Sequence, residues 1–330
     1  MSWISVPKLV AAVSNAGGLG MLATGALSPD QTKEALKEIR SLTDKPFGAN
    51  ATLILENGAE NADILLKEKI AFINFSLGKG DWIVKRAHEY GGKVFATVVN
   101  IRHAQRAQDY GCDGIIATGH EAAAHGDIAT TFTLIPRLAE VLKIPIIAAG
   151  GIATGRGLLA ALSLGASGAS MGTRFMTTKE SPLHANFKKK SIELDIGDTI
   201  FSDRFDGLLS RMMKTPAAEK AATAKINLLK IFMNSQAIAR EMKLPYFKLL
   251  KQVLTAPPEN IRQLFFMAQG FKSLQDASQM GDVEHGILPV GQVQGLIHDE
   301  PTVAEIMERI IDEAKSVNCQ VSSQMTDSKV

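Results

Sequence analysis

Four residues in two neighbouring turns, Gly150, Gly151, Gly172 and Thr173, have the types and spacing that can bind a phosphate group. Each turn follows a short apolar run within residues 144–181 that is typical of a buried strand. In parallel α/β proteins, ligands bind at the carboxyl ends of the strands, where glycine leaves backbone N–H groups accessible to an anion. One Gly-Gly pair could be only a tight turn. Two such turns in succession favour a phosphate site.

Charged and imidazole side chains near these turns leave several possibilities open. Arg174 could pair with the phosphate or a carboxylate, or it could form a structural ion pair. A charged segment at residues 203–206 could approach the site. His120, Glu121 and His125 are types that ligate metals, but they lie in a loop without helical i, i+4 spacing, and no further ligand group is evident. We therefore expect no metal site.

The elements that must position these residues alternate between strand and helix along the first half of the chain. Seven strands are expected near Leu22, Ala49, Ile73, Ala96, Ile116, Ile147 and Ala169. They recur at intervals of roughly 20–28 residues with helical spacing between them, which predicts a parallel sheet in an α/β protein. An eight-stranded barrel needs one more strand. Since the first element is a helix at residues 6–16, we expect the sheet to lack its first strand, through either an upstream start or an open barrel.

The repeat pattern divides the chain into three parts. Residues 1–199 are expected to form the barrel domain. Residues 200–280 begin with a loop-like segment at 200–211 and continue with helical patterns, which predicts a mostly helical subdomain over the substrate. Residues 281–330 are punctuated by glycine and then form an amphipathic helix, so we expect them to return to the barrel.

Composition excludes several classes of protein. The net charge is +2 and no basic stripe with interleaved aromatics occurs, which argues against a nucleic-acid partner. The two cysteines, Cys112 and Cys319, lie far apart, so we expect a cytoplasmic protein without a disulfide framework or a cysteine-ligated zinc. No run approaches the ~20 apolar residues that span a bilayer, and we expect no membrane association. The apolar residues 9–22 fit a helix and a strand better than a targeting segment.

Six stretches of the sequence resemble one known family. They are AAVSNAGGLG, PFGAN, GHEAAAHGD, IPIIAAGGIATGRG, MGTRF and GQVQGLIHDEPTVAEI. Together they are similar to the nitronate monooxygenase (2-nitropropane dioxygenase) family of FMN-dependent TIM (β/α)8-barrel enzymes, whose relatives include FMN-dependent enoyl-ACP reductases and NADH:quinone reductases. As a set the motifs are specific for this superfamily, but they separate its members poorly.

The resemblance implies an FMN site and one catalytic side chain. The residues carried over to FMN are Met1, Asn50, Thr118, Ala123, Gly150, Gly151, Ser170, Met171, Gly172 and Thr173. Of these, Met1 falls on a methionine at the flavin edge, and Thr118 stands where many members carry Gln. His125 matches the active-site histidine. Ala123 and Ala124 replace the usual Gly-Gly pair, and because alanine tolerates positive φ poorly, this loop is expected to differ or to have adapted.

The resemblance also implies an activity. The leading hypothesis is oxidation of alkyl nitronates by O₂ through a flavin semiquinone, with His125 holding the anion or deprotonating a neutral nitroalkane. The second is an NAD(P)H-dependent FMN reductase acting on quinones or enoyl thioesters, which the aromatic Trp3 near the start favours somewhat. The third is a flavin-free barrel with a binding role. Gln292 could line the flavin or cap a turn. A homodimer is possible.

Overall fold

The first part of the chain folds into a curled parallel sheet covered by helices. The computed structural model describes residues 1–223, 273, 274 and 276–327. The sheet contains seven parallel strands in sequence order: β1 (Gly20–Ala23), β2 (Phe47–Thr52), β3 (Phe72–Ser76), β4 (Lys93–Val98), β5 (Gly114–Thr118), β7 (Ile146–Ala149) and β8 (Gly168–Ser170). The strand-helix alternation and the seven predicted strands are confirmed. Strands β1 and β8 form the two edges of this open, TIM-barrel-type sheet.

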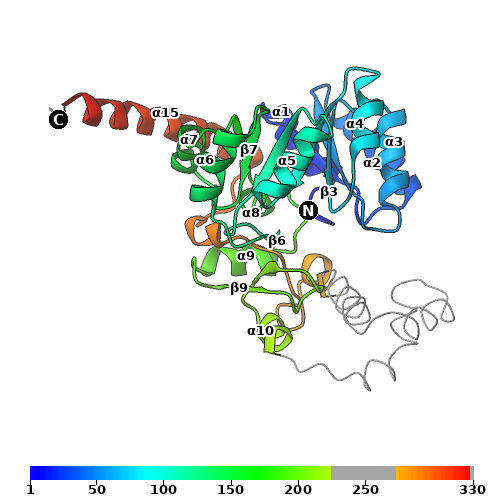
Figure 1. Ribbon diagram of the computed structural model, residues 1–330. Coiled ribbons are helices and arrows are strands. Elements are labelled where there is room, and N and C mark those ends of the chain that lie inside the picture. Colours follow the sequence, from blue (N-terminus) through cyan, green and yellow to red (C-terminus); the bar gives the residue numbers. More distant parts are fainter. Residues whose placement is uncertain (224–272, 275, 328–330) are drawn as a thin grey trace.

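The helices that connect the strands lie on the outside of the sheet (Figure 1). They are α2 (Pro29–Leu42), α3 (Gly58–Lys67), α4 (Asp81–His88), α5 (Ile101–Asp109), α6 (Thr131–Val141) and α7 (Gly155–Ser163). Helix α1 (Pro7–Asn15) precedes β1, and the short α8 (Thr173–Met176) follows β8. Helix α2 shows why they begin where they do. Ser28 accepts a hydrogen bond from the backbone N–H of Gln31, and the Gln31 side chain bonds back to the backbone of Ser28. This capping box satisfies two donors that a helix start leaves unpaired.

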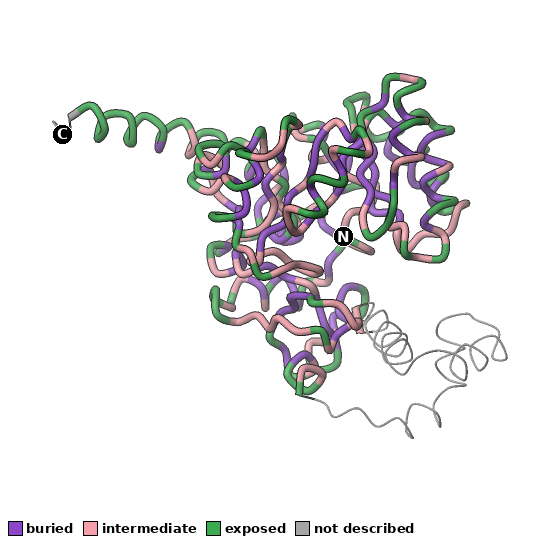
Figure 2. Tube along the Cα trace, in the orientation of Figure 1, coloured by how far each residue is buried: buried purple, intermediate pink, exposed green. Residues whose placement is uncertain are grey.

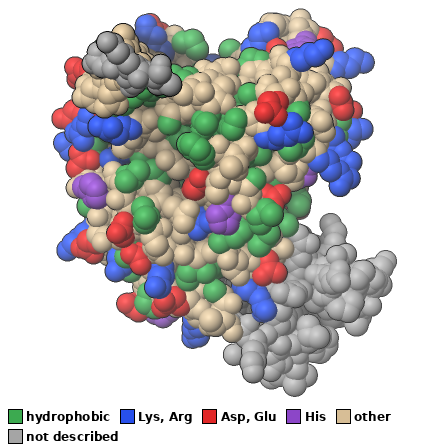
Figure 3. All heavy atoms as spheres, turned by 60° about the vertical axis from the view of Figure 1, so that its left-hand side comes forward, with side chains coloured by type: hydrophobic (Ala, Val, Ile, Leu, Met, Phe, Trp, Pro, Cys, Tyr) green, Lys and Arg blue, Asp and Glu red, His purple; other side chains and the backbone are tan. Residues whose placement is uncertain are grey.

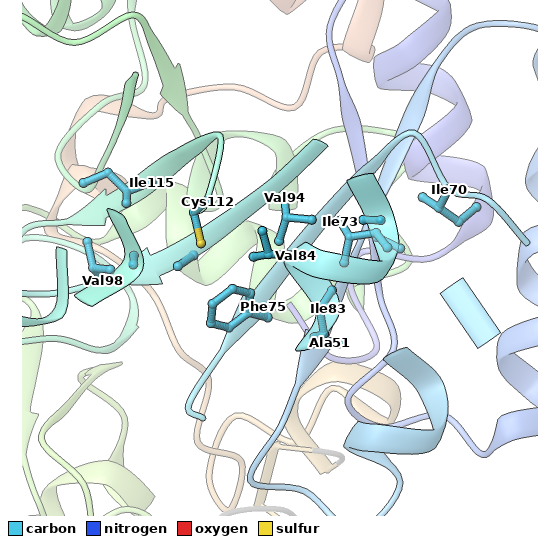
Figure 4. Close-up of a cluster of buried hydrophobic side chains, with 14 of the residues drawn as sticks. Ala51, Ile70, Ile73, Phe75, Ile83, Val84, Val94, Val98, Cys112 and Ile115 are labelled. Carbon is cyan, nitrogen blue, oxygen red and sulfur yellow. The ribbon is translucent and has the colours of Figure 1, made fainter. Parts of the chain in front are cut away.

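The outer face of the sheet forms the main hydrophobic core. Figure 4 shows Ile83 and Val84 of α4 packed against Ile73, Phe75 and Val94 of the adjacent strands. Ile73, Ile83 and Val94 have no exposed surface. Because side chains alternate along a strand, the intervening residues point into the barrel. The outer face therefore holds the fold together, and the inner face is left for other groups.

A second, smaller sheet joins the barrel to the rest of the chain. Its three antiparallel strands are β6 (Ala124–His125), β9 (Thr199–Ser202) and β10 (Ser210–Met213), in the order β6-β10-β9. The loop expected at residues 200–211 is therefore wrong in part, because β9 and β10 form a hairpin there. Strands β9 and β10 are only four residues long. Strand β10 also pairs with β6, which lies far away in the sequence. Local periodicity does not reveal such a pairing.

Further helices complete this smaller module within the described residues. They are α9 (Ala185–Glu193), α10 (Pro216–Thr223), the π-helical turn η1 (Asp276–Met280) and the 3-10 turn η2 (Gln292–Leu296). Phe187, Met213 and Leu288 form the centre of its own apolar cluster. The helices predicted between residues 224 and 272 lie outside the described part of the chain. The proposed division at residue 200 stays a prediction.

The C-terminal helix α15 (Val303–Asp327) packs on α7. The backbones approach so closely that a Cβ on Gly155 would lie 2.4 Å from the backbone O of Ile310 and the N of Ala314. The last turns of α15 project from the body of the molecule and are exposed (Figures 1 and 2). Of the helices that the structure describes, none is both long enough and apolar enough to cross a bilayer.

Candidate active site

The two glycine turns adopt the geometry that the sequence suggested. Gly150 and Gly151 follow β7 and have φ values of +99° and +75°, a left-handed conformation that glycine adopts without steric cost. Gly172 follows β8 and caps α8, and a Cβ there would meet nothing within 4 Å. Among the described residues, the backbone N–H groups of Gly151, Gly172 and Thr173 donate to no acceptor. The turns thus present free donors in open space, as an anion site requires.

A segment from the C-terminal part of the chain closes one side of these turns. The N–H of Gly291 donates to Oγ1 of Thr173 at 3.0 Å, and the N–H of Gln292 donates to the carbonyl of Glu121 at 2.9 Å. A Cβ on Gly291 would lie 2.9 Å from that same carbonyl and 3.4 Å from the N of Ala123. The loop after β5, the turn after β8 and the return segment therefore meet here. The sequence left open whether Gln292 lines the flavin or caps a turn, and the hydrogen bond of its backbone N–H to Glu121 is a structural contact.

The carboxylate of Glu121 lies beside the first glycine turn, with its carboxyl carbon 3.8 Å from the position of a Cβ on Gly151. Its carboxylate accepts hydrogen bonds from the N–H and the hydroxyl of Thr131 at 2.9 and 3.0 Å, at the start of α6. The same hydroxyl contacts the carbonyl of Gly150 at 2.9 Å. A carboxylate at a helix N-terminus is stabilised by the free N–H groups and the helix dipole. These hydrogen bonds fix both the loop and the carboxylate beside the first glycine turn.

Arg174 forms a structural ion pair. Its guanidinium is 3% exposed and donates to the Oδ1 of Asp299 at 3.0 Å and to the hydroxyl of Thr177 at 3.2 Å. Arg309 donates to the other oxygen of Asp299. Burial lowers the pKa of Arg174, and the contact with Asp299 opposes that shift. Of the roles that the sequence left open, the ion pair is the one that the structure supports.

Polar side chains line the inner face of the sheet below the turns. Asn50 of β2 donates to Oδ1 of its register partner Asn74 at 2.5 Å, and Thr97 of β4 donates to the same oxygen at 3.1 Å. Thr52 donates to Oδ1 of Asn50 at 3.0 Å. These bonds fix the amide of Asn50, which is 6% exposed. Thr118, at the end of β5, is also buried, at 9% exposed. Two of the predicted cofactor residues thus lie on the inner face.

The first residues of the chain lie at the end of β1. The carbonyl of Ser5 accepts a hydrogen bond from the N–H of Ala23, and the carbonyl of Met1 accepts from Ser5 in turn. Met1 is 57% exposed. Trp3, between them, has a φ of +58°, which is rare for a bulky residue. The predicted residues Ser170 and Met171, in contrast, lie in and just after β8, where Ser170 is exposed and Met171 half-buried.

The loop after β5 carries the histidine that the sequence singled out. Ala124 has a φ of +59°, so it keeps the left-handed conformation that its methyl group disfavours. His125, the next residue, contacts Asp206 through Nε2, which lies 2.6 Å from Oδ2 of the carboxylate. Their side chains are 34% and 23% exposed. Asp206 belongs to the charged segment at residues 203–206, and the structure brings it to His125.

Arg211 anchors this loop, and the sequence analysis missed it. Its guanidinium donates twice to the carbonyl of His120, at 3.0 and 2.9 Å, and once to Thr199 at 2.8 Å. It also lies over the ring of Phe201 at 5.2 Å, and the His120 ring meets the same phenyl edge-on. No local pattern marks Arg211, because its partners come from distant strands. His120 bonds through Nδ1 to the carbonyl of Asp127.

No cluster of three side chains that could ligate a metal occurs in the part of the chain described.

Charge on the molecular surface is mixed near these elements. Figure 3 shows acidic and basic side chains interspersed on the face turned forward, with no large region of a single sign. The net charge of +2 agrees with this balance.

Comparison with known proteins places these features in a family. The family model described as nitronate monooxygenase matches residues 1–70 and 55–313. The (3aS,4S,5R,7aS)-5-hydroxy-7a-methyl-1-oxo-octahydro-1H-indene-4-carboxyl-CoA dehydrogenase of Rhodococcus jostii is 32% identical over 321 residues, which cover 95% of this chain and 90% of the relative. The nitronate monooxygenase of Paraburkholderia phytofirmans is 31% identical, over 64% of this chain and 71% of the relative. The structure of FabK from Thermotoga maritima superposes with a TM-score of 0.80 and 33% identity, over 98% of this chain and 93% of that one.

Proposed function

The chain belongs to the nitronate monooxygenase family and is an oxidoreductase of the flavin type. From this we propose that it uses FMN and NAD(P)H to reduce the double bond of a 2-enoyl thioester. One observation carries the choice of substrate class. The relative from R. jostii, whose name ends in carboxyl-CoA dehydrogenase, aligns over 95% of this chain. The nitronate monooxygenase of P. phytofirmans aligns over only 64%.

The glycine turns fit the phosphate end of FMN. The free N–H groups of Gly151, Gly172 and Thr173 would hold the phosphate, and the left-handed Gly150 gives the turn its shape. Ser170 and Met171 would flank it. Open space at Gly172 supports this assignment, because a Cβ there meets nothing within 4 Å.

The inner face fits the ring end of the same cofactor. Asn50, fixed by Asn74 and Thr52, would hold the flavin ring by hydrogen bonds, with Thr118 and Ala123 beside it. Met1, at the end of β1, would lie at the ring edge. When bound, FMN supplies the hydride chemistry that side chains lack.

His125 would move the proton in this reaction. Reduction of a 2-enoyl thioester adds a hydride at the β-carbon and a proton at the α-carbon, so that NAD(P)H and one proton are consumed for each saturated thioester formed. An imidazole is suited to hold and release that proton near neutral pH. The ring is partly exposed and fixed on one side by Asp206, which leaves its other nitrogen for the substrate.

Oxidation of a nitronate by O₂ is the second candidate. The family model and the P. phytofirmans relative favour it. A nitronate is already an anion, so His125 would hold it rather than deprotonate it. The sequence analysis placed this activity first. We place it second because of the shorter alignment.

A flavin-free binding role is the weakest alternative, because both the glycine turns and the relatives support a flavin. A homodimer stays a prediction.

An anaerobic flavin spectrum tests these alternatives on the purified, FMN-loaded protein. We expect NADH or NADPH to bleach the flavin absorbance, and an equimolar 2-enoyl-CoA such as crotonyl-CoA to restore it. Bleaching by propionate 3-nitronate but not by a reduced nicotinamide would contradict the proposal and favour the second candidate. Riboflavin, which lacks the phosphate, is the control for the glycine turns and should bind far more weakly than FMN.

A further inference from the structure

The pair formed by His125 and Asp206 is fixed from both sides. The Nε2–Oδ2 distance of 2.6 Å is at the short end of hydrogen bonds to a charged acceptor. The second carboxylate oxygen, Oδ1, accepts from the backbone N–H of Leu208 at 3.2 Å. The N–H of Gly207 donates to the carbonyl of Asp203, which closes the turn that carries Asp206. The carboxylate is therefore held by its own loop before it reaches the imidazole.

The backbone on the histidine side is also constrained. His125 lies opposite Ser210 in the pairing of β6 with β10, and Ala124 lies opposite Arg211. Arg211 in turn holds the carbonyl of His120 at the start of the same loop. Strand pairing fixes the Cα position of His125 but leaves rotation about its side-chain bonds. Asp206 is the group that restrains this rotation.

The pair also decides which nitrogen carries the proton. A carboxylate only accepts hydrogen bonds, so Nε2 of His125 must be the donor. In the neutral imidazole, Nδ1 is then unprotonated, and within the described residues it has no partner. We propose that Asp206 is a positioning residue that fixes His125 in the Nε2–H tautomer and presents Nδ1 to the substrate. This inference deepens the proposed function and rests on it only where turnover is measured.

The consequence for catalysis follows from the geometry. With Nε2 occupied, proton transfer to or from the substrate must pass through Nδ1. A histidine without this restraint would divide its population between two tautomers and several ring orientations, and only some of these would be productive. Removing the carboxylate should therefore lower the turnover rate and leave substrate affinity nearly unchanged.

Two measurements on Asp206→Asn test the proposal. The first is the long-range ¹H–¹⁵N spectrum of the histidine-labelled protein, in which the His125 signals are assigned by their loss in His125→Gln. We expect the wild type to show the Nε2–H pattern, and Asp206→Asn to show a mixture of tautomers. The second is steady-state turnover of crotonyl-CoA. We expect kcat to fall by about 10–100-fold, less than the roughly 10²–10⁴-fold that general acid–base catalysis contributes as a whole, with KM within about threefold.

Asp203→Asn is the matched control. Asp203 lies in the same turn, its side chain is 52% exposed, and it contacts Arg204 rather than His125. It should change neither the His125 spectrum nor kcat. Equal losses in the two variants would overturn the proposal, because they would indicate a general effect on the loop. An Nδ1–H pattern in the wild type, or an unchanged spectrum in Asp206→Asn, would also overturn it. If the wild type turns over no thioester, the proposed function fails, and the spectra still decide the role of Asp206.

Discussion

The loop at the barrel mouth, residues 119–130, and the C-terminal joint, residues 299–314, both attach distant segments to the sheet, but by different means. In the joint, the buried Arg174 is paired with Asp299, and Gly155 stands where α15 approaches too closely for a side chain. At the mouth, an alanine is left-handed and His125 has an imidazole nitrogen without a partner in the described residues. In the joint the buried charge is paired, although Nε of Arg174 has no hydrogen-bond partner among the described residues, whereas the mouth keeps a left-handed alanine and an unpaired imidazole nitrogen.

The distribution of left-handed residues strengthens this contrast. In the described part of the chain, four residues other than glycine have positive φ values: Trp3, Lys69, Leu77 and Ala124. Lys69 ends a helix, where this conformation is common. Trp3, Leu77 and Ala124 instead lie near the carboxyl ends of β1, β3 and β5. Each costs about 1–2 kcal/mol. Local conflicts of this kind persist where function requires them, so the contrast supports a functional mouth and a structural joint.

The largest effect is expected at the mouth. His125→Gln removes the group that would carry the proton, so kcat for thioester reduction should fall by about 10³-fold. Because the side chain is 34% exposed and makes one hydrogen bond, the free energy of unfolding should change by no more than about 1 kcal/mol. Steady-state kinetics and urea denaturation measure the two effects. A loss of stability that accounts for the lost activity would erase the contrast with the joint.

The joint should show the opposite behaviour. Asp299→Asn leaves the buried guanidinium of Arg174 without a negative charge and should lower the free energy of unfolding by about 2–3 kcal/mol, with kcat nearly unchanged. This value is below that for a fully buried pair because Asp299 is 41% exposed. Asp312→Asn, which breaks an exposed pair with Lys315, is the control and should cost less than about 0.5 kcal/mol.

The stability difference between the wild type and Asp299→Asn is also expected to depend on pH. Burial raises the pKa of Asp299, but hydrogen bonds from Arg309 and Arg174 outweigh it, and the pKa lies below the ordinary value. A lowered pKa in the folded state gives stability that is present above the unfolded pKa, about 3.9, and is lost as the pH falls through the folded value. The stability difference between wild type and Asp299→Asn should therefore narrow below about pH 4. A difference independent of pH would show that charge is not its source.

The strands of the barrel were easier to predict from the sequence than the contacts of the mouth. Short apolar runs located all seven strands, because a strand buried on both faces has a local signature. The Ser28 cap was equally local. The hairpin of β9 and β10 was missed, since its third strand is β6, whose two residues precede it by about 80 positions. Periodicity within a window does not carry such a pairing.

The residues of the candidate site also differ in how far they could be predicted from the sequence. The first glycine turn was predictable, because consecutive glycines after an apolar run indicate a tight turn, and the positive φ values of Gly150 and Gly151 are observed. Ala124 was recognised only as a departure from a family pattern. Asp206 was one of three charged residues in a loop, and Arg211 was not noticed. Both act through contacts that only the folded chain brings together.

Gly151→Ala is expected to have an effect of intermediate size on FMN binding at the mouth. A Cβ there would lie 3.6 Å from Glu121, an ordinary contact, so the folding cost comes from the φ of +75° and should be about 1 kcal/mol. The methyl group and the altered turn should weaken FMN binding by about tenfold, equal to 1.4 kcal/mol. Gly91→Ala is the matched control, with a φ of +82° and nothing within 4 Å. It should cost similar stability and leave the FMN Kd unchanged. Equal FMN affinity in both variants would remove Gly151 from the proposed site.

The smallest expected effect is a gain in the free energy of unfolding rather than a loss. Ala124→Gly relieves the left-handed strain at the mouth but adds freedom to the unfolded chain, so the free energy of unfolding should rise by only about 0.5–1 kcal/mol. Ala122→Gly, two residues earlier at a position without positive φ, gains no relief and should lower it by about 0.5–1 kcal/mol. Urea denaturation of the two variants compares them directly. If both destabilise the protein, the conformation of Ala124 carries no strain, and the difference between mouth and joint then rests on the His125 and Asp206 pair alone.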